Sequence, residues 1–399
     1  MIEDLFNILT FRAGYNTSVV IAGVIALGIG GGVVGVFSLL RKRALISDAI
    51  SHATLPGIGL AFLTAVALGS SGRNLALLMV GAALTGALGV FIVQWIRDHT
   101  RLPEDTAIGT VLSVSFGIGI VLLSYIQTLH IAGQAGLNSF LLGSTATLSG
   151  GEAQLIVIAA SVAIAIALMF MKEFGAVAFD EEFAGAQGWQ VARLDLAMLA
   201  LLLAIVVIGL KTVGLVLIIA LVIIPPAAAR FWTERLGRMV FLSGAFGGLA
   251  GWIGGAVSAL FPDMPTGAVI VLVAGAIFVF SLLLAPARGV FAFAIKQARL
   301  RAIAARARGA LALADGHPPP DKTSYTVTRL YGLVDRNGRI TLKGSTAAAH
   351  ATRQRRLWRA YQIRHPEEAL KFNPLSGYPI DEMLPADLLV ALERESTET

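Results

Sequence analysis

Long apolar runs recur between residues 17 and 286 of the chain and are separated by short polar connections. Each run holds about 20 residues, which is enough for an α-helix to cross about 30 Å of hydrocarbon. The runs therefore predict an all-α polytopic membrane protein with nine transmembrane helices, at residues 17–40, 45–68, 75–96, 107–128, 153–171, 194–210, 212–229, 239–260 and 267–286.

The composition agrees with a membrane protein, because only 14% of the residues are charged, against about 25% in soluble domains. Cysteine is absent, which excludes thiolate metal ligands and a disulfide framework. The net charge is +6, and the basic residues gather in the tail after residue 287 and in the connections after odd-numbered spans. The positive-inside rule then predicts a bacterial-type inner or plasma membrane protein with its N-terminus outside and its tail in the cytoplasm.

The change in pattern near residue 286 divides the chain into three predicted segments. Residues 1–286 form a transmembrane domain, residues 287–323 a linker helix with a Pro-rich linker, and residues 324–399 a small cytoplasmic α+β domain. Within the last segment, residues 332–344 have the pattern of a β-hairpin that leads into a helix.

Asp48 and His52 are the clearest candidates for chemistry, because both are ionisable and lie inside a predicted span. An aspartate inside the membrane costs roughly 2.5 to 3.5 kcal/mol, so such residues are candidates for functional sites. Their i, i+4 spacing places both side chains on one helical face, where a carboxylate and an imidazole can share a divalent transition metal. The alternative is a polar pair that only holds helices together.

Prolines inside apolar runs are a second feature. Pro56, Pro225 and Pro226 each remove a backbone donor and can kink or break a helix. Transporters use such breaks near their pathway, but a simple packing kink is an equally good interpretation of Pro225 and Pro226.

An acidic, amphipathic stretch separates the fifth and sixth predicted spans. It runs from residue 178 to residue 189 and predicts a short helix that stops at Gly188. Judged by its residues alone, this stretch on the cytoplasmic side is better interpreted as a solvated loop than as a contact for a partner protein, which is the alternative.

Four stretches resemble the permease subunits of binding-protein-dependent ABC importers for zinc, manganese and iron. They are the signature Ser47-Asp48-Ala49-Ile50-Ser51-His52-Ala53-Thr54-Leu55-Pro56-Gly57, the short run Phe140-Leu141-Leu142-Gly143, the segment Phe179-Asp180-Glu181-Glu182-Phe183-Ala184 with Gly188, and residues 213–230 with Pro265-Thr266-Gly267. The resemblance covers roughly residues 19–286 and implies the helical fold of type II ABC importers.

The resemblance also implies roles for particular residues. Asp48 and His52 take the transported ion of manganese, zinc or iron. Pro56 and Pro225 stay the candidates for helix breaks near its path, on the pattern described above. The residues that contact the ATPase are Phe179, Asp180, Glu182, Ala184 and Gly188. The implied partners are a cytoplasmic ABC ATPase dimer, an extracytoplasmic metal-binding protein and a second permease copy or paralogue. No permanently bound cofactor is expected. ATP hydrolysis is expected on a separate subunit, since this chain has no phosphate-binding loop motif.

The tail resembles the winged-helix and dimerisation helices of metal-dependent repressors. The resemblance rests on residues 332–344, 353–361 and 378–385. The repressors use a Glu-His pair where this chain has Asp381-Glu382, so we expect a degenerate metal-sensing or dimer-stabilising module and do not expect nucleic acid as a partner. Two other functions stay open: a membrane-tethered metal sensor, and an ion-coupled secondary transporter without an ATPase.

Overall fold

The computed structural model describes residues 8, 10, 12, 14–43, 45–69, 74–129, 150–261, 264–335, 337–369 and 380–398. The run 140–143 that contributes to the family resemblance lies outside these residues. The chain divides into two compact units, Met1–Gly289 and Val290–Thr399.

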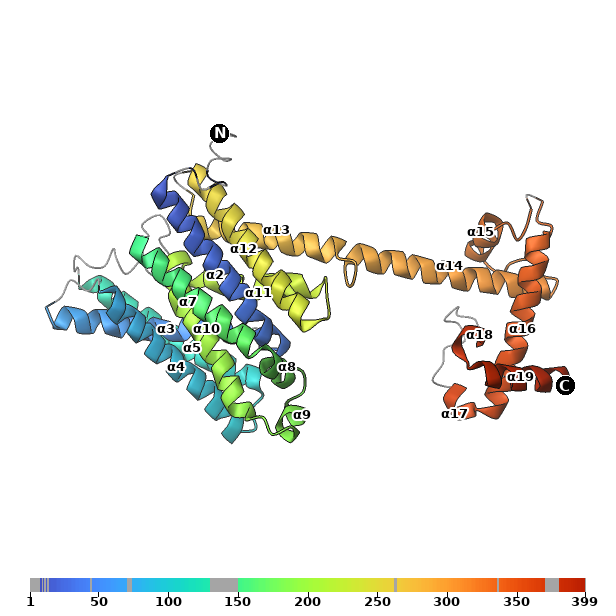
Figure 1. The fold of residues 1–399 in the computed structure, drawn as a ribbon, viewed down its shortest axis with the longest axis horizontal. Helices are drawn as coiled ribbons and strands as arrows, with labels where there is room; N and C mark the ends of the chain where they lie inside the picture. The colour runs from blue at the N-terminus through green and yellow to red at the C-terminus, as the bar shows by residue number, and fades with distance from the viewer. Residues whose placement is uncertain are drawn as a thin grey trace. The chain divides into compact units, whose positions relative to one another are not determined.

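The first unit is a bundle of long helices (Figure 1). They are α2 (Tyr15–Leu40), α3 (Ile46–Ala67), α4 (Leu75–His99), α5 (Glu104–Thr128), α7 (Gly150–Met169), α10 (Val191–Val213), α11 (Leu215–Arg230), α12 (Leu236–Leu260) and α13 (Thr266–Leu284). Two short helices, α8 (Met171–Phe179) and α9 (Glu181–Ala186), stand between α7 and α10.

Eight helices among the described residues are long and apolar enough to cross a membrane, which confirms the all-α polytopic fold. The predicted span 212–229 corresponds to α11, a helix of 16 residues. At 1.5 Å per residue it reaches only about 24 Å, less than the thickness of the hydrocarbon core. Gly214, with φ of 84°, is the single residue that separates α10 from α11.

Helix α2 is the centre of the bundle and packs against α12, α7, α11 and α10. Its glycines allow this close approach. A Cβ atom on Gly28 would overlap the backbone of Gly247 in α12, and a Cβ atom on Gly247 would overlap the backbone of Gly28. Small residues of this kind are what membrane helices use to bring their backbones together.

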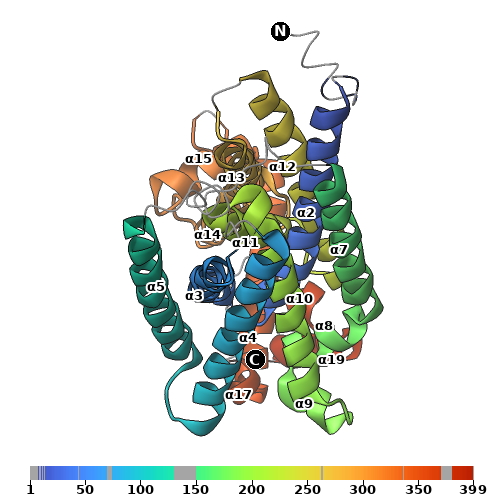
Figure 2. The ribbon, with the colours of Figure 1, turned by 90° about the vertical axis from the view of Figure 1, so that its left-hand side faces the viewer.

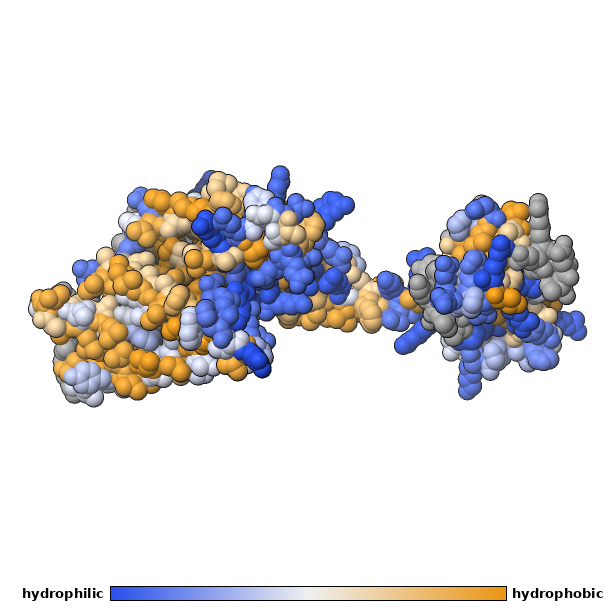
Figure 3. All heavy atoms as spheres, turned by 90° about the horizontal axis from the view of Figure 1, so that it is seen from below, coloured by the Kyte–Doolittle hydropathy of each residue, from blue (hydrophilic) through white to orange (hydrophobic). Residues whose placement is uncertain are grey.

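Helix α3 packs against α4 and α5, and Figure 2 shows it end-on between them. The helix is continuous through Pro56. In its most apolar window 72% of the residues are buried, against 22% for α5, which lies at the edge of the bundle. Figure 3 shows large apolar areas on the surface of the bundle unit, as expected for a protein in contact with lipid.

The second unit comprises α14 (Val290–Ala314), α15 (Lys322–Leu330), α16 (Leu342–Arg364), α17 (Pro366–Ala369), α18 (Ile380–Met383) and α19 (Ala386–Glu398). Its core includes Leu357, Tyr361 and Leu392. The predicted β-hairpin is reduced to one antiparallel bridge between Val334 and Ile340, and no sheet is found in the part of the chain that the structure describes. A bridge this short adds little β character to the predicted α+β domain.

Candidate functional site

Asp48 and His52 lie within the first two turns of α3. His52 Nε2 is 3.3 Å from Asp48 Oδ1, and the two side chains are 18% and 32% exposed, respectively. Two ligands that each lie about 2.1 Å from a tetrahedral zinc ion are about 3.4 Å apart. This separation fits two ligands of one divalent ion, and it fits equally a direct ion pair between the imidazole and the carboxylate.

The imidazole of His52 also contacts α5. Its ring meets the ring of Phe116 edge to face, with centroids 5.0 Å apart and an interplanar angle of 84°. Nδ1 of His52 is buried and has no hydrogen-bond partner among the described residues. Phe116 could not be identified from the sequence, because an aromatic residue in an apolar run has the pattern of any lipid-facing or core residue.

The pair supplies only part of a metal site. Across the described residues, no group of three or more His, Asp or Glu side chains is placed to hold a metal ion. Pro56 lies one turn after His52 and has no N–H, so the helix offers no regular donor to the carbonyl oxygen of His52. That oxygen is a further polar atom on this part of α3, and the remaining ligands of a four-coordinate ion would have to come from elsewhere.

Pro225 lies in another helix of the bundle. It and Pro226 lie within α11, and Pro226 and the carbonyl of Val222 pack against Gly35 of α2. The contact of Pro226 with Gly35 agrees with the packing interpretation of that proline.

The acidic stretch after α8 forms the short helix α9. The carboxylate of Asp180 caps it by accepting a hydrogen bond of 2.9 Å from the N–H of Phe183. Ala184 is buried, Glu182 is exposed, and Gly188 ends the turn with φ of 86°. Three large side chains around this helix are exposed: Phe179, Phe183 and Trp189. Such a group of apolar side chains on a surface is typical of a docking site for another protein.

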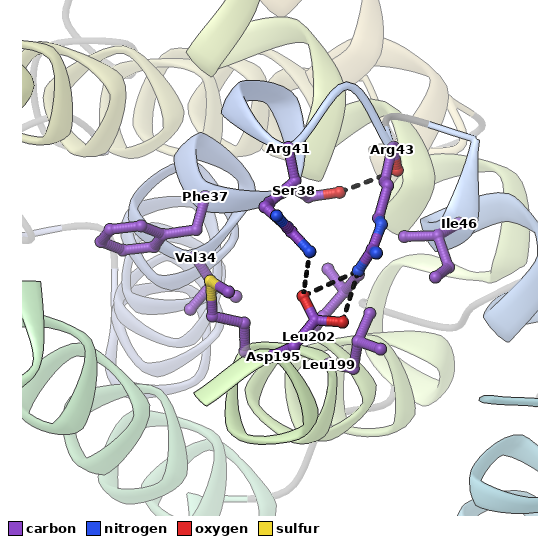
Figure 4. Close-up of a pocket in the computed structure, with 10 residues that line it drawn as sticks. Val34, Phe37, Ser38, Arg41, Arg43, Ile46, Asp195, Leu199 and Leu202 are labelled. Atoms are coloured by element: carbon purple, nitrogen blue, oxygen red, sulfur yellow. Dashed lines mark hydrogen bonds and ion pairs between the residues drawn. The ribbon is translucent and has the colours of Figure 1, made fainter. Parts of the chain in front are cut away.

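A buried ion cluster lies at the N-terminal end of α10, and it was not predicted from the sequence. Asp195 is 2% exposed, and both of its oxygens accept hydrogen bonds from Arg43 Nη1, at 2.6 and 2.7 Å. Arg41 Nη2 lies 3.1 Å from Oδ1, and Arg97 Nη1 lies 3.3 Å from Oδ2. Figure 4 shows Arg41 and Arg43 converging on this carboxylate.

The cluster extends outward through two glutamates. Arg41 Nη1 donates to Glu181 of α9 at 2.8 Å, and Arg43 Nε lies 2.5 Å from Glu104 at the start of α5. The only signal in the sequence was an acidic residue at 195 within an otherwise apolar run. Its partners at 41, 43 and 97 are far away in the chain, so no local pattern connects them.

The fold and these features define a multi-pass helical membrane protein with an ionisable pair inside one span. The sequence profile of the ABC 3 transport family matches residues 15–303. The chain belongs to this family.

Similar proteins have been described in several bacteria. The manganese transport system membrane protein MntC of Bacillus subtilis (strain 168) is 42% identical over 313 residues, which cover 78% of this chain and 70% of that protein. The zinc transport system membrane protein TroC of Treponema pallidum (strain Nichols) is 39% identical over 276 residues, covering 69% of this chain and 91% of that protein. Among solved structures, PsaBC from Streptococcus pneumoniae in complex with Fab matches with a TM-score of 0.62 and 28% identity, covering 75% of this chain and all of that chain.

The family assignment and the eight spans confirm the predicted class, a multi-pass permease subunit of an ABC transporter in the plasma membrane. An ion-coupled secondary transporter is no longer supported.

Proposed function

We propose that this chain is the permease subunit of an ATP-driven, binding-protein-dependent importer of manganese, zinc or iron ions. The observation that carries the proposal is the pair Asp48 and His52, held 3.3 Å apart in a largely buried span. The relatives named as manganese and zinc transport proteins support this choice of substrate.

The pair would bind the ion during its passage. The Asp48 carboxylate offsets part of the cost of removing a divalent ion from water, and His52 contributes a nitrogen that suits transition metals. Two ligands make a weak site, and a second permease copy or paralogue in a dimer would contribute two more. An ion pathway requires this balance, because an ion that binds too strongly is not released.

The partners follow from the same proposal. An extracytoplasmic binding protein delivers the metal, and a cytoplasmic ATPase dimer docks on α9, where Phe179, Phe183 and Trp189 are exposed. Asp180 caps the start of the docking helix, and Gly188 follows its C-cap residue with a positive φ. Ala184 anchors the helix, and Glu182 adds charge to its surface. With α11 as a ninth, shorter crossing, this arrangement puts the N-terminus outside and the tail in the cytoplasm, as the positive-inside rule predicts.

For the tail, residues 324–399, we propose a degenerate winged-helix module that senses metal or stabilises the dimer. The order of α15, the bridge between Val334 and Ile340, and the long α16 supports this comparison. Deletion of residues 290–399 tests it: retained uptake that no longer responds to metal indicates a sensor, and loss of the dimer indicates a structural role.

The transport proposal is tested by metal accumulation in cells that express this chain with its ATPase and binding protein. We expect Asp48→Asn and His52→Ala to abolish accumulation of Mn²⁺ and Zn²⁺ while the protein stays in the membrane. Asp105→Asn and His99→Ala are matched controls, because both residues are exposed and lie outside the pair. Normal uptake by both site variants would refute the site.

A further inference from the structure

The ion cluster around Asp195 joins parts of the chain that are far apart in sequence. We call it the Asp195 cluster, and it consists of Asp195 (α10), Arg41 and Arg43 (the α2–α3 connection), Arg97 (α4), Glu104 (α5) and Glu181 (α9). Through these residues, α9, the helix proposed to dock the ATPase, is connected to the start of α3, the helix that carries Asp48 and His52.

The charges of the Asp195 cluster balance only when all its helices are in place. The buried part contains the single carboxylate of Asp195 and the guanidinium groups of Arg41 and Arg43, whose side chains are 9% and 6% exposed. Arg97, which is 24% exposed, adds a third positive charge, and the two more exposed carboxylates of Glu104 and Glu181 complete the balance of three against three. Displacement of α9 would therefore leave Arg41 with less compensation, and a buried cation without its partner is strongly unfavourable.

The backbone between the two arginines is unusual. Lys42 has φ of 60°, the left-handed conformation that non-glycine residues adopt only at some cost. Two hydrogen bonds of 3.0 Å between Ser38 and Arg43 hold this turn: Arg43 N–H donates to the Ser38 carbonyl, and Ser38 Oγ donates to the Arg43 carbonyl. The turn directs both arginine side chains to one carboxylate (Figure 4).

Arg43 is also part of the start of α3. Its carbonyl accepts a hydrogen bond of 3.0 Å from the N–H of Ile46, the first residue of that helix. Asp48 follows Arg43 by five positions, and α3 continues as one helix to Ala67. A shift of Arg43 therefore moves the helix end on which the metal pair is located.

We infer that the Asp195 cluster transmits the movement of α9 to α3, with Glu181, Arg41, Asp195 and Arg43 as successive positioning residues for the metal pair. When the ATPase moves α9, Glu181 moves with it and Arg41 follows. The contact between Arg41 and the Asp195 carboxylate then changes, Arg43 adjusts its own contact with that carboxylate, and the start of α3 shifts with Arg43. This inference rests on the proposed transport function and adds the route by which the ATPase acts on the site.

The test compares transport with ATP hydrolysis in proteoliposomes that contain this chain and its ATPase, supplied with binding protein and Mn²⁺ or Zn²⁺. Glu181→Gln is the informative variant, because Glu181 is 54% exposed and Arg41 keeps Asp195 as its other partner. We expect unchanged association with the ATPase, retained ATP hydrolysis, and at least a fivefold fall in metal ions transported per ATP hydrolysed. Glu181→Asp keeps the charge and should recover most of this ratio.

Glu234→Gln is the matched control, since Glu234 forms an exposed ion pair with Arg288 at 2.7 Å and is distant from α9 in the sequence. It should leave transport, hydrolysis and the unfolding midpoint unchanged. A wild-type ratio in Glu181→Gln would overturn the inference, and so would loss of the ATPase from the complex, since that result makes Glu181 a docking residue. Failure of the transport proposal itself is distinguishable, because the wild-type complex would then carry neither metal.

Discussion

The substitution Asp195→Asn tests how strongly the buried cluster holds the bundle together. Asp195 is 2% exposed and is shared by Arg41, Arg43 and Arg97. Removing one partner of a buried ion pair costs about 3–5 kcal/mol, because the remaining charge has no compensation. Asparagine keeps the shape and one accepting oxygen, so we expect a loss of about 3 kcal/mol, or roughly a hundredfold decrease in the ratio of folded to unfolded protein.

The assay is denaturant unfolding of the full chain in detergent, with helix content followed by circular dichroism. Glu234→Gln serves as the control, because an exposed ion pair contributes only about 0–1 kcal/mol. If Asp195→Asn unfolded at the same denaturant concentration as the wild type and this control, the cluster would not contribute to stability and the charge-balance reasoning would be wrong.

Three further predictions concern other parts of the chain. Gly247→Ala should lower stability by about 1–3 kcal/mol in the same unfolding assay, because the added methyl group meets the backbone of Gly28. Phe183→Ala should reduce copurification of the ATPase several-fold, because it removes an exposed ring from α9. In the tail, the hydrogen bond from Arg355 holds the pKa of Asp315 below its ordinary value, so this contact stabilises the fold above about pH 4 and is lost as the pH falls through the lower folded-state pKa. Thermal unfolding of wild type and Asp315→Asn should differ at neutral pH and converge in acid.

Each of these predictions has a result that contradicts it. Gly275→Ala meets no atom within 4 Å, so it should be neutral or stabilising, and equal effects at Gly275 and Gly247 would disprove the close helix contact. If the Phe183→Ala variant copurified as much ATPase as the wild type, α9 would not be the docking helix. A difference between wild type and Asp315→Asn that persists in strong acid would show that the charge of Asp315 is not its cause.

The helical architecture could be predicted from the sequence because long apolar runs allow few alternatives in a membrane. The exceptions have local physical causes. Gly214 adopts a positive φ and joins α10 directly to a helix of 16 residues, whereas hydropathy alone predicts another full span. In the tail, the run 332–344 forms one bridge between Val334 and Ile340, because a hairpin with no third strand gains too little from pairing.

How much of the candidate site could be predicted also depends on whether a contact is local in the sequence or joins distant parts of the chain. The pairing of Asp48 with His52 follows from i, i+4 geometry and needs no tertiary information. The ring of Phe116 on His52 and the three arginines on Asp195 require knowledge of which helices meet. Phe116 is 64 positions from His52, and Asp195 is 98 positions from Arg97 and 152 from Arg43. A single sequence carries no such information.

The segment from Arg41 to Pro56 departs from the rules of local structure in three places. Lys42 has a left-handed backbone, Asp48 and His52 place ionisable groups inside a span, and Pro56 stands within a continuous helix. Each feature is unfavourable by itself, and proteins keep such features where function requires them. Their concentration in one segment, which is anchored at one end by the Asp195 cluster, agrees with our inference that the start of α3 has a defined position and moves during transport.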